Sequence, residues 1–161
     1  MLYRNRSEVS TDVDRSRGRL AGKAFRLSRG FPDDKAELTH ILVVGDSATS
    51  RRWYEEVLGA EVQSEYGTSV VLRFRGAWLL LVEGGDPTED KPTVTLAPPS
   101  DPDTRDNLFT IRVSDCHAVY EELRSRGATF LTAPMSHGPE TRCFFRDPDG
   151  HLFEISEYRP D

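Results

Sequence analysis

Glu140 and Arg142 place a carboxylate and a guanidinium two residues apart, and these two groups could act together on a substrate. They flank Thr141 at the start of a predicted strand. Glu140 could act as a general base or as an oxygen ligand, and Arg142 could bind an anionic group of a substrate. A surface ion pair is the alternative interpretation of the same two residues.

Several common catalytic motifs are absent from the sequence. It contains no P-loop, no GxGxxG and no GxSxG, so nothing favours nucleotide hydrolysis, dinucleotide binding or serine hydrolysis. Cys143 lies on a predicted strand, and no histidine stands at a spacing that would make a nucleophile pair with it. The sequence DPDG at residues 147–150 is typical of a turn, because proline presets the backbone and glycine accepts a left-handed conformation. We expect a structural role for that turn.

The elements that position these residues begin at residue 38, where strand and helix patterns start to alternate. Residues 38–44 are apolar and β-branched and lead to Asp46, which can cap a helix. That helix is predicted to end at Gly59, a residue that tolerates a left-handed backbone. Three strands are expected next, at residues 61–65, 69–75 and 77–83.

The same order of elements returns after a connector, residues 84–106, that contains five prolines. A strand at residues 108–113 leads to a cap at Asp115 and to a helix that ends at Gly127. Three further strands are expected at residues 129–132, 141–146 and 151–158. Two long repeats with matched caps indicate a duplicated βαβββ unit, since each half presents a sheet face that is covered only when the other half packs beside it. The predicted fold is α+β, with two tandem βαβββ modules that form a curved mixed sheet around one cleft.

The charge distribution divides the chain into two parts. The 161 residues are 37% hydrophobic and 30% charged, as expected for one soluble globular domain. Residues 1–37 carry nine Lys or Arg and six Asp or Glu, whereas residues 38–161 carry 12 and 21. We therefore expect a basic, flexible extension at 1–37 and an acidic domain at 38–161, which disfavours nucleic acid as a ligand. The alternative is an extension anchored on the domain or on a second subunit by Leu20, Phe25, Leu27 and Phe31.

The sequence indicates a cytoplasmic protein that does not enter a membrane. Its N-terminus lacks an apolar signal region, and the longest apolar run, residues 77–82, is far too short to span a bilayer. Cys116 and Cys143 lie far apart and form no CxxC motif, so neither a disulfide framework nor a structural zinc site is indicated.

Three segments of the chain resemble the vicinal oxygen chelate superfamily, which includes glyoxalase I, extradiol dioxygenases and the bleomycin and fosfomycin resistance proteins. They are Thr39-His40-Ile41, residues 46–59 and residues 146–155, in the order and spacing of a duplicated frame. The resemblance covers about residues 38–158, with module one at 38–83, a linker at 84–106 and module two at 107–158.

The resemblance implies a divalent metal, Zn, Ni, Mn or Fe, between the modules. In this family the ligands are inward side chains on the first and last strands of each module, and these positions imply His40 and Glu154 here. The other two positions fall on Leu80 and Phe109, which cannot bind a metal. The alternative is a packed His40 and a Glu154 paired with an arginine such as Arg142. Candidates for a missing ligand are Glu83, His137 and Glu140.

Two functions are compatible with this resemblance. In a metal-dependent lyase, isomerase or dioxygenase, the cation would act as a Lewis acid on two neighbouring substrate oxygens, with Glu140 or Glu83 as the base. In a drug- or metabolite-sequestering protein, Phe109 and Phe144 would line the pocket beside Arg142, and a homodimer would enclose a small molecule. An acidic surface would attract a cationic ligand to the second kind of site.

Overall fold

The computed structural model describes residues 36–101 and 103–160. The predicted N-terminal extension lies almost entirely outside these residues, so its limits and its flexibility stay predictions, as does any anchoring by Leu20, Phe25, Leu27 and Phe31. No helix within the described ranges is long and apolar enough to cross a membrane.

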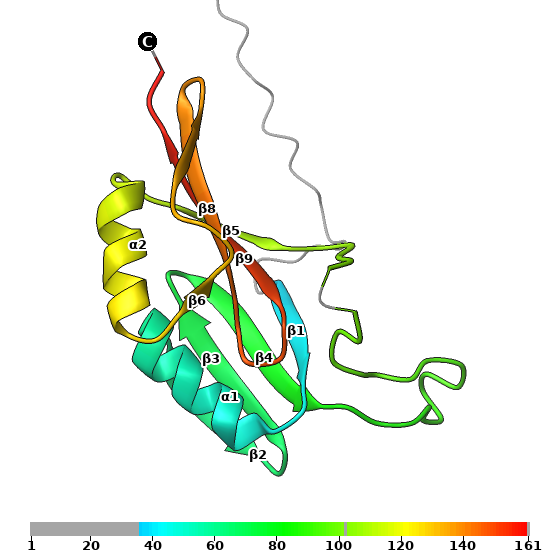
Figure 1. The fold of residues 1–161 in the computed structure, drawn as a ribbon. Coiled ribbons are helices and arrows are strands. Elements are labelled where there is room, and N and C mark those ends of the chain that lie inside the picture. Colours follow the sequence, from blue (N-terminus) through cyan, green and yellow to red (C-terminus); the bar gives the residue numbers. More distant parts are fainter. Residues whose placement is uncertain (1–35, 102, 161) are drawn as a thin grey trace, which may run out of the picture. The chain divides into compact units, whose positions relative to one another are not determined.

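The first module follows the predicted order of elements closely. Asp46 caps its helix by accepting a hydrogen bond from the Thr49 amide at 2.7 Å, and Gly59 ends it in a left-handed conformation, with φ at 70°. The last turn of the helix widens to π geometry. The elements are β1 (Thr39–Val44), α1 (Ser47–Trp53), the π-helical segment η1 (Tyr54–Leu58), β2 (Glu61–Tyr66), β3 (Ser69–Phe74) and β4 (Ala77–Glu83) (Figure 1).

The second module repeats the first and adds one short strand. Asp115 caps its helix through the Ala118 amide at 2.8 Å. The additional strand, β7, pairs only with β8, so it lies at an edge, where flanking proline and glycine are tolerated. The elements are β5 (Phe109–Arg112), α2 (Cys116–Ser125), β6 (Thr129–Phe130), β7 (Met135–His137), β8 (Glu140–Arg146) and β9 (Leu152–Tyr158).

Each module forms its own mixed sheet. The strand orders are β1-β4-β3-β2 and β5-β9-β8-β6, and the first and last strands of each module run parallel. In both modules a glutamate of the last strand caps the first residue of the helix: Glu83 accepts from the Ser47 amide and Glu157 from the Cys116 amide. This internal correspondence fits a duplicated unit, and the predicted α+β fold of two βαβββ modules is confirmed.

The two modules meet through the faces of their sheets that the helices cover. Trp53 of α1 lies 6.2 Å from Phe145 and 6.5 Å from Phe153 between ring centroids, so the first helix also packs on the second sheet. Phe145 and Phe153 are themselves stacked at 5.2 Å. In return, Arg126 after α2 donates to the Val57 carbonyl of η1 at 3.3 Å. The apolar core is therefore continuous from one module to the other.

The DPDG turn, residues 147–150, joins the modules with polar contacts. The Tyr54 hydroxyl donates to Asp147 at 2.7 Å, and Asp147 is only 5% exposed. Asp149 accepts from the Ser50 hydroxyl at 2.6 Å and from the Gly45 amide at 2.7 Å. The predicted structural role of the turn thus extends beyond reversing the chain, because its carboxylates hold the start of α1 against module two.

Two buried thiols lie at the contact between α2 and β8. The sulfur atoms of Cys116 and Cys143 are 3.8 Å apart, and both residues are free cysteines. Burial is the main cause that raises the pKa of both thiols, for Cys143 to about 12. Both cysteines are therefore protonated and pack as small apolar side chains at neutral pH.

Candidate functional site

The second sheet has one face against α2 and an opposite face rich in polar side chains, here called its outer face. Phe153 and Ile155 of β9 are 2% and 0% exposed and point toward the helix side. Because side chains alternate along a strand, Glu154 points to the outer face. Strand pairing brings neighbours to it from β5 and β8. The outer-face cluster comprises Thr110, Arg112, Glu140, Arg142, Phe144, Glu154 and Ser156.

Hydrogen bonds connect the members of the outer-face cluster. Glu154 accepts from the Thr110 hydroxyl at 2.7 Å, and its other oxygen lies 3.9 Å from an Arg142 nitrogen. The same nitrogen lies 3.4 Å from Glu140, whose second oxygen accepts from the Ser156 hydroxyl at 2.6 Å. Arg142 therefore lies between two carboxylates, and its side chain keeps 39% of its surface exposed. It is a cation that a small molecule can reach.

Glu140 is held in its ionised form by its neighbours. The hydrogen bond from Ser156, followed by the positive charges of Arg142 and Arg112, lowers the pKa of Glu140, while desolvation opposes them. A carboxylate with a lowered pKa is a poor proton acceptor at neutral pH. Glu140 is better placed to orient Arg142 than to act as the base that the sequence suggested.

His40 and Phe109 lie together on the helix-covered side, away from the outer-face cluster. Along β1, His40 has the same orientation as Leu42, which is 1% exposed. The His40 ring meets Phe109 edge-on at 4.5 Å, and Phe109 stacks on Phe153 at 4.8 Å. Burial, followed by the nearby His151, lowers the pKa of His40. The structure therefore does not bring His40 and Glu154 onto one face.

The two remaining candidate ligands occupy different positions. Glu83 accepts hydrogen bonds from both the amide and the hydroxyl of Ser47, so its carboxylate caps α1 instead of facing the cluster. His137 on β7 is the cross-strand neighbour of Glu140 and is exposed. Of the residues predicted for the site, Glu140, Arg142, Phe144 and Glu154 are thus close together.

Three members of the cluster were not predicted from the sequence. Ser156 could have been found, because strand alternation puts it on the same face as Glu154. Thr110 and Arg112 alternate with the apolar Phe109 and Ile111 in the same way. Strand β5 is short, however, so its alternation is a weak signal.

The residues present do not fit a divalent metal centre. Both carboxylates of the cluster lie within 4 Å of Arg142, whose positive charge opposes a bound cation. Zn, Ni and Fe also favour imidazole ligands, and His40 faces the other side of the sheet. Within residues 36–101 and 103–160, no three His, Cys, Asp or Glu side chains are grouped so that they could hold a metal ion.

The architecture and the outer-face cluster define a protein of paired βαβββ modules with a polar, partly buried site on its second sheet. Residues 37–155 match the model of the Glyoxalase/Bleomycin resistance protein/Dioxygenase superfamily. The chain belongs to this superfamily, as its resemblance to the vicinal oxygen chelate proteins predicted.

Similar proteins include both enzymes and a protein named for virulence. A virulence protein of Salmonella typhimurium is 29% identical over 73% of this chain and 81% of its own length. Glutathione transferase FosA of Serratia marcescens is 28% identical over 73% and 78%. Among solved structures, a glyoxalase/bleomycin resistance protein/dioxygenase from Nocardioides superposes with a TM-score of 0.64 at 21% identity, over 79% of this chain and 85% of that one. This last similarity concerns the fold alone.

Proposed function

We propose that this protein binds a small oxygenated anion on the outer-face cluster and holds it without metal-dependent turnover. The observation that carries the proposal is Arg142, a reachable guanidinium fixed between Glu140 and Glu154. Such a group binds carboxylates and phosphonates through two parallel hydrogen bonds. The Phe144 ring, 5.9 Å from the Arg142 guanidinium, offers an apolar contact beside it.

The sequestering alternative is preferred to the metal-dependent enzyme because of the groups that surround Glu154. Its oxygens already interact with Thr110 and Arg142, and Glu140 has a lowered pKa. A Lewis-acid mechanism needs a bound cation and an available base. The outer-face cluster is better suited to binding an anion than to holding a cation or supplying a base.

Isothermal titration with 1,2-dihydroxypropylphosphonic acid and with biphenyl-2,3-diol, in the presence of EDTA, tests the proposal. A fosfomycin resistance protein of similar fold was solved with the first compound, and the name of a relative includes the second. Saturable binding of the phosphonate is expected. Arg142→Ala should weaken it about 10- to 100-fold, as for a lost hydrogen bond between charged groups. Arg142→Lys should restore part of the affinity.

Arg124→Ala is the matched control, because Arg124 lies on α2, pairs with Glu121 and is remote from the cluster. Equal binding by the Arg142 and Arg124 variants, or no binding of either compound, would argue against the proposed site. Stoichiometric Mn(II) in the purified protein that is lost in Glu154→Ala would instead favour the metal-dependent enzyme.

We further propose a homodimer in which the second copy covers the outer face of the second sheet. Large apolar side chains around that face are exposed: Leu108 at 47%, Met135 at 53% and Tyr158 at 58%. Light scattering is expected to give twice the chain mass of 18.2 kDa. Met135→Glu should lower the mass toward that of one chain, because it would bury a charge at the contact. Leu131→Glu, at a residue 50% exposed outside the strands, serves as control; a monomeric wild type would refute the dimer.

A further inference from the structure

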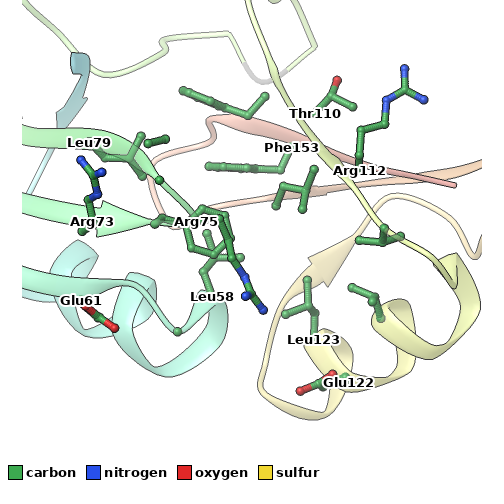
Figure 2. Close-up of a pocket in the computed structure, with 18 of the residues that line it drawn as sticks. Leu58, Glu61, Arg73, Arg75, Leu79, Thr110, Arg112, Glu122, Leu123 and Phe153 are labelled. Carbon is green, nitrogen blue, oxygen red and sulfur yellow. The ribbon is translucent and has the colours of Figure 1, made fainter. Parts of the chain in front are cut away.

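A large cavity lies between the two modules, on the helix-covered side of the second sheet (Figure 2). Its volume is about 1040 Å³. Module one contributes Leu58 and Leu79 to its wall, and module two contributes Leu123 and Phe153, all of which are buried. Native interiors leave few voids larger than a water molecule, whereas small-molecule sites occupy roughly 300 to 1,000 Å³. The volume is that of a small-molecule site, and the lining combines apolar side chains with charged ones.

Strand β5 lies between this cavity and the residues of β8 and β9 in the outer-face cluster, and its own residues Thr110 and Arg112 border both. Phe109 points toward Phe153, on the cavity side, and Thr110 bonds to Glu154 on the opposite face. In Figure 2 the labelled side chains of Thr110 and Arg112 extend away from Leu58 and Leu123. Thr110 and Arg112 of the cluster border the cavity, but Glu140, Arg142 and Glu154 do not line it, so the proposed anion site at Arg142 and the cavity are distinct.

Arg75 provides a positive charge at the mouth of the cavity. It lies in the turn between β3 and β4, and its guanidinium extends into the space between Leu58 and Leu123 (Figure 2). Within the described part of the chain, Arg75 has no hydrogen-bond or ionic partner. Its φ of 48° is in the left-handed region, where asparagine or glycine is usual in such a two-residue turn. An arginine held in an unfavourable backbone conformation is consistent with a role for its side chain.

Most other charges on the cavity wall are already paired. Arg126 interacts with Glu122 and with the Val57 carbonyl. Arg73 stacks over the Trp78 ring at 4.2 Å, but its buried Nη1 has no hydrogen-bond partner among the described residues. Glu61, at the start of β2, has no partner among the described residues.

We propose that the cavity binds an amphipathic organic anion. Its apolar body would lie against Leu58, Leu123 and Phe153, and its carboxylate or sulfonate would pair with Arg75. Burial of a hydrocarbon or aromatic body supplies most of the affinity, and the unpaired guanidinium selects for a negative headgroup. This ligand class differs from the small polar anion of the outer-face cluster.

Fluorescence titration of the full chain with 8-anilinonaphthalene-1-sulfonate, followed by displacement with dodecanoate, tests this proposal. One saturable site is expected. Arg75→Asn should weaken it about tenfold, as for one lost charge-assisted hydrogen bond, although asparagine suits the turn and should leave the melting temperature unchanged or raised. Glu61→Gln should tighten binding, because it removes a negative charge from the wall. Val119→Trp should weaken binding, because the larger side chain would narrow the space.

Two control variants distinguish the cavity from the remaining surface of the protein. Arg52→Asn, at an exposed arginine of α1 that does not line the cavity, should leave the affinity unchanged. Arg142→Ala should also leave the affinity of the cavity unchanged. Failure of the cavity proposal can therefore be distinguished from failure of the proposed outer-face site. The proposal is overturned if Arg52→Asn weakens binding as much as Arg75→Asn, or if no saturable binding occurs. It is also overturned if deletion of residues 1–36 tightens binding tenfold, since the chain's own N-terminal segment would then be the occupant.

Discussion

Replacing Phe153 by alanine is expected to lower the free energy of unfolding by about 3 kcal/mol, at the lower end of the range for buried aromatic residues. Phe153 is 2% exposed and stacks on Phe109 at 4.8 Å and on Phe145 at 5.2 Å. Its ring also lies 6.2 Å from that of Tyr54 in module one, so truncation would remove contacts with both modules. The loss falls at the lower end because the space created opens into the inter-module cavity, which Phe153 already lines.

Urea denaturation followed by tryptophan fluorescence measures this loss, since Trp53 lies 6.5 Å from Phe153 between ring centroids. Leu152→Ala is the matched control, because Leu152 is the preceding residue of β9, points to the other face and is only half-buried. Leu152→Ala should lower the free energy of unfolding by clearly less than Phe153→Ala does. Equal losses for the two variants would show that Phe153 does not join the two modules as described.

Removing the Asp147 carboxylate is expected to lower the free energy of unfolding by about 2 to 4 kcal/mol. Asp147 accepts hydrogen bonds from the Tyr54 hydroxyl at 2.7 Å and from the amides of His151 and Asp149 at 2.7 and 3.1 Å. Asp147→Ala would leave these donors without a partner, and Tyr54 is fully buried. Thermal and urea unfolding should both show the loss.

Asp147→Asn distinguishes hydrogen bonding from the simple loss of volume. Asparagine keeps one acceptor oxygen and nearly the same shape, so it should recover part of the stability lost in the alanine variant. A double-mutant cycle with Tyr54→Phe should give a coupling energy of about 0.5 to 3 kcal/mol. Strict additivity of the two changes would contradict a direct contact between modules through this pair.

Local signals made most of the fold predictable. Asp46 and Asp115 cap the two helices as their positions before each helix suggested, and Gly59 adopts the left-handed conformation expected at a helix end. Such signals act over a few residues and need no tertiary context. The short strand β7 was missed because Pro134 and Gly138 flank it, and only its pairing with β8 makes it a strand.

The site was predicted only in part, because its residues are set by which face of a strand they occupy. Strand alternation, which puts Ser156 on the same face as Glu154, also gives His40 the orientation of Leu42, which is toward the helix. The spacing of the family's motif had suggested otherwise. The contact between Tyr54 and Asp147 spans 93 positions in the sequence, and no local pattern reveals it.

The close pair of thiols at the contact between α2 and β8 can be used to detect local opening of this contact. Cys116 is 0% exposed and Cys143 is 1% exposed, and the pKa of Cys143 is raised to about 12. Alkylating reagents attack thiolates, so the closed protein should resist them. Each labelling event then requires that the helix separate from the strand, and the labelling rate reports how often this happens. The labelling rate of the two cysteines thus measures how often the second module opens locally.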